Sequence, residues 1–181
     1  DARRLTELRE IAKAVQMYEI DNGEYPFESL ANNILNTEGY DEVYTASFVN
    51  SSNKPSGSSW RVYSEFETLL EPYLPTMPSD PLNTGGIYSG DDNYSYQYYI
   101  NTDRQVMLTT KFETDHQLRC ELQGYELVVS PIYENYGYTD GPACYGSHGK
   151  TISPSSIISL SAYQDGTDVA ERMKKTFYIN F

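Results

Sequence analysis

The first 22 residues carry the clearest hydrophobic pattern of the chain. Apolar side chains recur there every three or four positions, which is the spacing of one face of an α-helix. This face consists of Leu5, Leu8, Ile11, Ala12, Val15 and Tyr18. The positions between them are charged or polar, namely Arg4, Glu7, Arg9, Glu10, Lys13 and Gln16. The pattern predicts an amphipathic helix with one buried and one solvated face.

The end of this helix is marked by its own signals. Gly23 can adopt the left-handed conformation that closes a helix, and Pro26 prevents the helix from resuming. The periodicity starts without a preceding N-cap residue or turn signal. We therefore expect that the helix is the lower end of a longer one that continues upstream.

Shorter elements follow in the middle of the chain. A helical turn is predicted at residues 27–35, and residues 45–59 have the Ser, Asn, Gly and Pro content of an exposed loop. Ser64 and Glu67 have the spacing of a capping box, which predicts a second amphipathic helix over residues 64–73. A proline-rich connector comes after that helix.

The second half of the chain is predicted to form strands. Apolar residues alternate over residues 94–100 and again over residues 106–112, with a hairpin loop between the two segments. Further strands are predicted at residues 125–130, 157–163 and 176–181. A helix first and antiparallel strands after it predict an α+β fold, with the long helix packed on one face of an antiparallel sheet.

Two segments resemble the family of type IV pilins and type II secretion pseudopilins. The first has the family's order and spacing at Ala2-Arg3-Arg4, Glu7-Leu8-Arg9, Ile11, Ala14-Val15, Tyr18 and Asp21-Asn22-Gly23-Glu24-Tyr25-Pro26. The second, residues 72–83, is similar to the family's segment Y-L-P-x-x-P-x-D-P. The resemblance covers residues 1–113, and it includes the tyrosine-rich strand pair that follows the second segment.

The resemblance implies a pilin-like fold and a structural role in a filament. It implies one pilin-like domain over residues 1–181, divided into the helix (1–26), a core (27–113) and a C-terminal elaboration (114–181). An apolar half-helix upstream would anchor the subunit in the inner membrane and later pack in the filament core. The expected location is extracytoplasmic, in the periplasm or at the bacterial cell surface. The candidates for contacts with other subunits are Arg3, Arg4, Glu7 and Arg9.

Three roles within the family stay open. A pseudopilin pushes substrates outward as a short filament, a type IV pilin builds a surface fibre, and a minor pilin sits at the tip or primes assembly. The first half of the chain favours the major pseudopilins. The long region after Phe112 resembles the exposed region of type IV pilins and favours a pilus-like fibre subunit.

The two cysteines lie in this C-terminal region. Cys120 and Cys144 are the expected partners of a disulfide, because an exported protein meets an oxidising compartment. Closing a loop of about 25 residues stabilises a fold by roughly 3–4 kcal/mol on the chain-entropy model. A zinc site is a poor alternative, since the spacing C-x-x-C is absent from the sequence.

An alternative function of a different class is an adhesive, glycan-binding module such as a tip adhesin. Its basis is a cluster of aromatic residues near the cysteines, Tyr133, Tyr136, Tyr138 and Tyr145. Tyrosine offers an apolar ring and a polar hydroxyl, and sugars stack on exposed rings. Packing of the loop onto the sheet by the same tyrosines is the favoured interpretation.

The charge composition disfavours two classes of binding partner. The chain of 181 residues has a formal net charge of −13, and this charge would repel nucleic acid and anionic lipid. Its 18 tyrosines against 6 phenylalanines suit half-exposed sheets and subunit contacts. The sequence has no apolar run near the roughly 20 residues that cross a bilayer.

Motifs for catalysis and cofactors are weak. Ser147, His148 and His116 lack a recognisable constellation of nucleophile, base and oxyanion donors, so we expect a protein without catalytic residues. Calcium is the single cofactor that the sequence raises, because acidic turns offer oxygen ligands. These acids are Asp91, Asp92, Asp165 and Asp168. Their spacing differs from that of an EF-hand, and solvated turn acids are the favoured interpretation.

Overall fold

The computed structural model describes residues 1–39, 41–57, 59–84, 94–114, 120–122, 128–129, 144–145 and 176–180. The helices within these ranges are α1 (Ala2–Asn22), α2 (Glu28–Glu38) and α3 (Tyr63–Leu70). The strands are β1 (Glu42–Ala46), β2 (Gln97–Asn101), β3 (Val106–Lys111), β4 (Cys120–Leu122), β5 (Val128–Val129), β6 (Cys144–Tyr145) and β7 (Thr176–Asn180). The predicted α+β class is confirmed.

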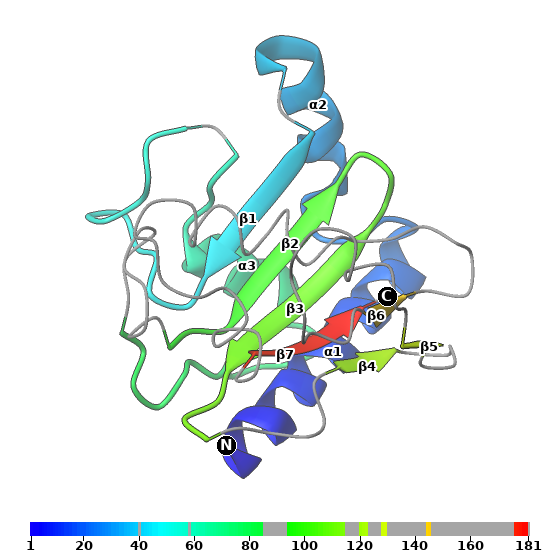
Figure 1. Ribbon diagram of the computed structural model, residues 1–181. Helices are drawn as coiled ribbons and strands as arrows, with labels where there is room; N and C mark the ends of the chain where they lie inside the picture. Colours follow the sequence, from blue (N-terminus) through cyan, green and yellow to red (C-terminus); the bar gives the residue numbers. More distant parts are fainter. Residues whose placement is uncertain are drawn as a thin grey trace.

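The main sheet has the strand order β1-β2-β3-β7-β4, and β5 pairs with β6 separately (Figure 1). The pairs β1–β2, β2–β3 and β3–β7 are antiparallel, as predicted. The outermost pairing differs, because β4 runs parallel to β7. The prediction of a fully antiparallel sheet was therefore wrong at this edge. Parallel neighbours cannot be joined by a tight hairpin, and residues 123–175 separate β4 from β7 in the sequence.

Helix α1 covers one face of the sheet, and the side that it buries is the predicted apolar face. Leu8, Ile11, Ala12 and Val15 are fully buried, and the half-buried Leu5 packs against the same core. The helix lies against β3, β7 and α3, and Figure 1 shows α1 and α3 behind the sheet. The apolar face of this 21-residue helix thus packs α1 onto the sheet along its length.

Helix α3 runs beside α1 in the same direction. Near its start, burial and then the charges of Glu67 and Glu7 raise the pKa of Tyr63. Just beyond its end, the ring of Tyr73 lies 6.2 Å from that of Tyr18, centroid to centroid. The early part of α1 therefore faces the start of α3, and its later part faces the end of α3.

The predicted end of α1 is confirmed. Gly23 has a φ of 75°, in the left-handed region, and its N–H donates to the carbonyl of Glu19 over 2.8 Å. The turn predicted after Pro26 is longer than expected, because α2 extends to Glu38. It ends at Gly39, whose φ of 76° is a closing signal that the sequence reading overlooked.

Two predicted features are wrong. The loop predicted at residues 45–59 begins inside strand β1, and Phe48 and Val49 form a small buried cluster with Trp60 packed on it. Strand β1 is buried on both faces, so its sequence lacks the alternation that reveals a half-exposed strand. The described exposed loop starts at Asn50.

The capping box predicted at Ser64 is the second error. Helix α3 starts at Tyr63, its N-cap is Val62, and no side chain caps it. Tyr63 is 5% exposed and its hydroxyl donates to the carbonyl of Pro78 over 2.9 Å. Burial of this ring sets where the helix begins, and Ser64 stays exposed within the first turn.

The predicted strands of the hairpin are confirmed. Tyr96, Tyr98, Ile100, Val106, Leu108 and Phe112 all belong to the core. Ile100 pairs with Val106, and the buried hydroxyl of Tyr98 donates to the carbonyl of Pro26 over 2.7 Å. The C-terminal strand is present as β7, with Ile179 buried. Of residues 125–130, only 128–129 are described, as β5, and residues 157–163 lie outside the described residues.

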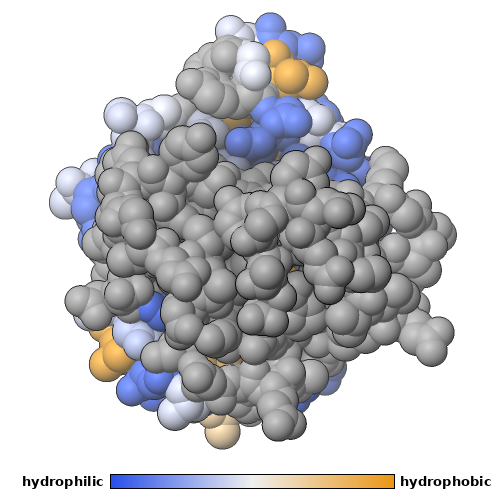
Figure 2. Space-filling model, in the orientation of Figure 1, coloured by the Kyte–Doolittle hydropathy of each residue, from blue (hydrophilic) through white to orange (hydrophobic). Residues whose placement is uncertain are grey.

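The surface of the described part is mainly polar. Figure 2 shows hydrophilic side chains around the rim of the view and apolar ones in separate small patches, one of them at the tip of α2. The large exposed apolar residues are Met17, Ile20, Leu35 and Leu82. Scattered apolar side chains of this kind are normal on a folded surface, whereas adjacent ones on one element are informative.

We expect the helix–sheet core to dominate stability. Replacing Leu8 with Ala removes a fully buried side chain and leaves a cavity, which costs roughly 2–5 kcal/mol. Lys13 is exposed on the opposite side of α1, and Lys13→Ala is expected to change stability by less than about 0.5 kcal/mol. Denaturant unfolding of both variants measures the difference, and equal small losses would contradict the packing described for α1.

Candidate functional site

The start of α1 is fixed by a buried arginine. The side chain of Arg4 is 1% exposed and donates to Asp80 through two parallel hydrogen bonds. The distances are 2.6 Å from Nε to Oδ2 and 3.0 Å from Nη2 to Oδ1. Such a bidentate pair combines charge attraction with a fixed geometry.

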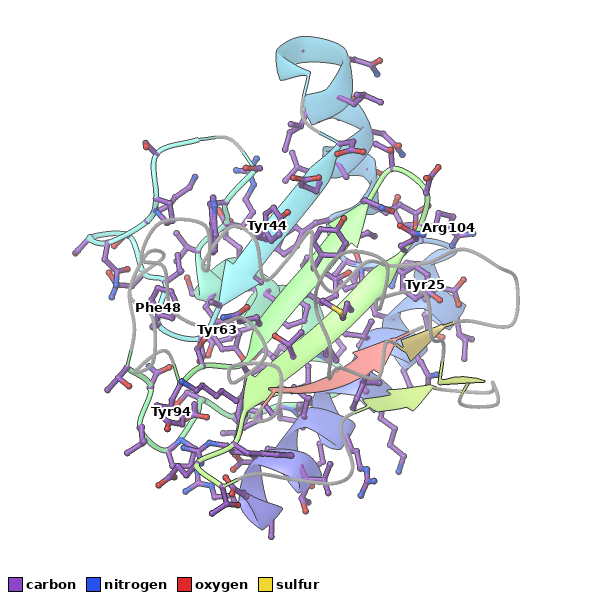
Figure 3. All side chains as sticks on the ribbon, viewed as in Figure 1. Tyr25, Tyr44, Phe48, Tyr63, Tyr94 and Arg104 are labelled. Carbon is purple, nitrogen blue, oxygen red and sulfur yellow. The ribbon has the colours of Figure 1, made fainter. Side chains whose placement is uncertain are left out.

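Two further carboxylates reach the same guanidinium. Nη1 of Arg4 lies 2.6 Å from Oε1 of Glu113 and 3.2 Å from Oδ1 of Asp1. Burial by itself would lower the pKa of Arg4, but the hydrogen bonds to Asp80 and Glu113 outweigh it and raise that pKa. The guanidinium also lies 5.1 Å from the centre of the Tyr94 ring, which Figure 3 labels. Arg4 is therefore a permanent cation.

The acidic partners are themselves held by the backbone. Asp80 accepts hydrogen bonds from the N–H groups of Leu82 and Asn83. Asp1 accepts from the N–H of Glu113 over 2.8 Å, and from the N–H and hydroxyl of Thr114. The group of Arg4, Asp80, Asp1 and Glu113 joins the start of α1, the proline-rich connector and the end of β3. We name it the Arg4 clasp.

The residues predicted to contact other subunits differ in their exposure. Arg4 was placed on the solvated helix face, and this was wrong, because it lies one turn before Leu8 on the buried side. Glu7 is mostly buried, pairs with Arg3 over 2.7 Å and accepts a hydrogen bond from the hydroxyl of Tyr96. Arg3 and Arg9 remain exposed, so they can still reach a neighbouring molecule.

Sequence reasoning missed the partners of Arg4. The available signal was an aspartate between prolines, at Asp80, together with an arginine in register with the apolar helix face. Glu113 offered no comparable signal, since it follows a strand like many surface acids. Its side chain is 54% exposed, so its pairing with Arg4 is only partly shielded from water.

A second arginine holds the opposite end of α1. Arg104, in the β2–β3 hairpin, lies 2.8 Å from Glu28 and 3.3 Å from Glu19. Its guanidinium lies 5.4 Å from the centre of the Tyr25 ring, and Figure 3 shows the two side chains together. Arg104 thus links the hairpin to the end of α1 and to the start of α2.

The other face of the sheet carries an aromatic cluster beside two acids. The Trp60 ring stacks on Tyr44 at 5.3 Å, and Tyr44 lies 5.1 Å from Tyr99, centroid to centroid. Burial and then a hydrogen bond with Asp41 raise the pKa of Glu42 to about 7, although its hydrogen bond with Tyr44 lowers it. Glu42 is therefore expected to change charge near neutral pH.

Other predicted site residues lie outside the described residues. These are Asp91, Asp92, Asp165 and Asp168, raised for calcium, Ser147, His116 and His148, and Tyr133, Tyr136 and Tyr138. The side chains of Cys120, Cys144 and Tyr145 are likewise not described, but β4 and β6 lie beside each other. The disulfide stays a prediction. Within the described ranges, no three His, Cys, Asp or Glu side chains are grouped to hold a metal ion.

Comparisons of the chain with protein-family models, curated proteins and solved structures gave no match. In the part of the chain that the structure describes, no helix has the length and apolar character needed to cross a membrane.

The Arg4 clasp predicts a large difference between two adjacent arginines. Arg4→Met leaves buried carboxylates without their cation and is expected to cost roughly 3–5 kcal/mol of stability. Arg3→Met removes an exposed pair with Glu7 and is expected to cost less than about 1 kcal/mol. Denaturant unfolding at pH 7 measures both. Similar losses in the two variants would argue against the clasp.

Glu42 predicts a pH dependence with a definite sign. Its pKa rises from 4.5 to about 7 on folding, so the folded state favours the protonated carboxyl. The resulting stability is full below pH 4.5 and is lost as the pH rises through about 7. Glu42→Gln keeps a neutral side chain, and the loss between these pH values should shrink. Glu65→Gln, on the exposed face of α3, serves as control, and identical profiles for both variants would refute the assignment.

Proposed function

We propose that this chain is the head of a pilin-like filament subunit, with a structural rather than a catalytic role. The observation that carries the proposal is a contact between the two segments that resemble the family. Arg4 of the helix segment forms its bidentate pair with Asp80 of the proline-rich segment. A pattern split over distant parts of the sequence is thus one unit in space.

Other residues of the pattern have roles that fit the proposal. Gly23 closes α1, and the carbonyl of Pro26 accepts a hydrogen bond from Tyr98 on the sheet. The apolar face of α1 is used against the sheet, which leaves its opposite face exposed along the helix. A rod presented in this way suits side-by-side packing of copies, and repeated heterologous contacts produce an open helical polymer.

The proposal includes the partners and the location of the subunit. An apolar segment upstream of α1 would hold the subunit in the inner membrane before assembly and would form the filament core afterwards. The head would then lie outside the cytoplasm, in contact with further copies or with related pilins. Among the family roles, residues 114–181 with their two cysteines support a pilus-like fibre subunit over a pseudopilin.

Genetic removal tests the proposal. Deleting the gene in its native host should abolish a class of surface fibres, or reduce protein export if the filament is a pseudopilus. Complementation with the full-length gene should restore the phenotype, and antibodies against this chain should label sheared fibres. A deletion strain with normal fibres and normal export, together with unlabelled fibres, would contradict a filament role.

A further inference from the structure

The exposed side of α1 combines cations with apolar residues. Its positions are Thr6, Arg9, Glu10, Lys13, Met17 and Ile20, which we name the α1 stripe. Arg9 and Lys13 lie one turn apart, and Met17 and Ile20 continue the line with 49% and 74% of their surface exposed. Two of the four large exposed apolar residues in the described part of the chain are therefore neighbours on this stripe.

The neighbouring helix has the opposite charge. The exposed residues of α3 and of its last turn are Ser64, Glu65, Thr68 and Glu71, which we name the α3 acidic face. No Lys or Arg occurs in the sequence between Arg61 and Arg104, so α3 itself carries no cation. Within the described residues, Glu65 and Glu71 take part in no ion pair.

The two surfaces belong to one helical layer. Helices α1 and α3 lie beside each other behind the sheet (Figure 1). They run in the same direction, because Tyr63 lies near Glu7 and Tyr73 lies near Tyr18. Within one chain, the cations of the stripe and the acids of α3 point outward from adjacent helices. A second copy placed with its helices parallel to the first can bring an α1 stripe against an α3 acidic face. The layer is thus complementary to a copy of itself.

We infer that the α1 stripe of one copy docks on the α3 acidic face of a neighbouring copy. The choice of a second copy as the occupant follows from this charge complementarity, and the parallel arrangement rests on the proposed filament. Arg9 and Lys13 approach Glu65 and Glu71 of the neighbour, while Met17 and Ile20 lose contact with water at the end of the contact. The contact is electrostatic at its centre and weakens with salt.

Zero-length cross-linking tests the contact directly. A carbodiimide joins a lysine amine to a carboxylate in contact with it, and equal amounts of ¹⁴N-labelled and ¹⁵N-labelled chain distinguish links between copies from links within one. At millimolar protein and low ionic strength, mass spectrometry should find mixed-isotope peptides that join Lys13 to Glu65 or Glu71. Raising the salt to about 0.5 M should reduce their yield, because the Debye length becomes shorter than the separation of exposed charges. Absence of mixed peptides would overturn the inference.

Charge reversal provides a second, independent test. The variant Arg9→Glu/Lys13→Glu and the variant Glu65→Lys/Glu71→Lys each place like charges on both surfaces. Each should lower association of identical copies by roughly tenfold or more. Lys and Glu have similar helix propensities, so neither change disturbs the helices themselves. Mixing the two variants, or combining all four substitutions in one chain, should restore association measured by sedimentation. Failure of both to restore it would refute the pairing.

The two proposals can fail separately. Normal fibres in a host that carries either reversed variant would refute the docking contact and leave the filament role intact. The converse result is a cross-link between Lys13 and the α3 acidic face, with surface fibres and protein export both normal after deletion of the gene. That result would retain the contact and refute the filament role. Leu35→Lys, on the exposed side of α2, is the control, since it changes surface charge away from both helices of the contact.

Discussion

The Arg4 clasp is the interaction on which the arrangement of the chain depends. One guanidinium joins the start of α1, the proline-rich connector after α3 and the segment after β3. These segments are far apart in the sequence, and none of them could satisfy a buried arginine by itself. Removing the charge of Arg4 or of Asp80 leaves its buried partner without full compensation, so the three segments depend on one another. The helix is thereby held in one register against the sheet.

A second fixed point lies at the other end of α1. Arg104 contacts Glu19 and Glu28 from the hairpin, and Gly23 closes the helix between them. Arginine contacts hold both ends of α1, and its apolar face packs on β3 and β7. Its remaining side is exposed, and it carries charged residues together with the apolar Met17 and Ile20. One side of α1 is buried against the sheet and the opposite side is accessible, which supports the proposed structural role.

Charge in this protein is unevenly distributed, and the distribution matters more than the total. The chain has a formal net charge of −13, and a net charge far from zero generally favours solubility. The exposed side of α3 carries Glu65 and Glu71 and no Lys or Arg, whereas α1 has Arg9 and Lys13 on its exposed side. In the proposed filament, weak contacts between exposed charges would allow the subunit to remain separate before assembly. The energy that holds a filament together would then come mainly from apolar packing elsewhere.

The sequence determined the elements whose pattern has a local cause. The period of α1, its glycine end, and the alternating strands at residues 94–100 and 106–112 were predictable from spacing and backbone preference. Strand β1 was not, because its five residues show no clear alternation and run into a segment of loop-like composition. The start of α3 was also missed, since it lies at the buried Tyr63 and not at the capping signal of Ser64. The parallel pairing of β4 with β7 was equally hidden, since strand order has no signature in either segment.

For the candidate site, tertiary structure made the decision about Arg4. Helical spacing puts Arg4 in register with the apolar face, one turn before Leu8, but its charge favoured the solvated face. The partners that reverse this preference are Asp80 and Glu113, which spacing within the helix does not reveal. Sequence thus shows which residues share a helix face, whereas long-range partners decide whether a charged residue on that face is buried.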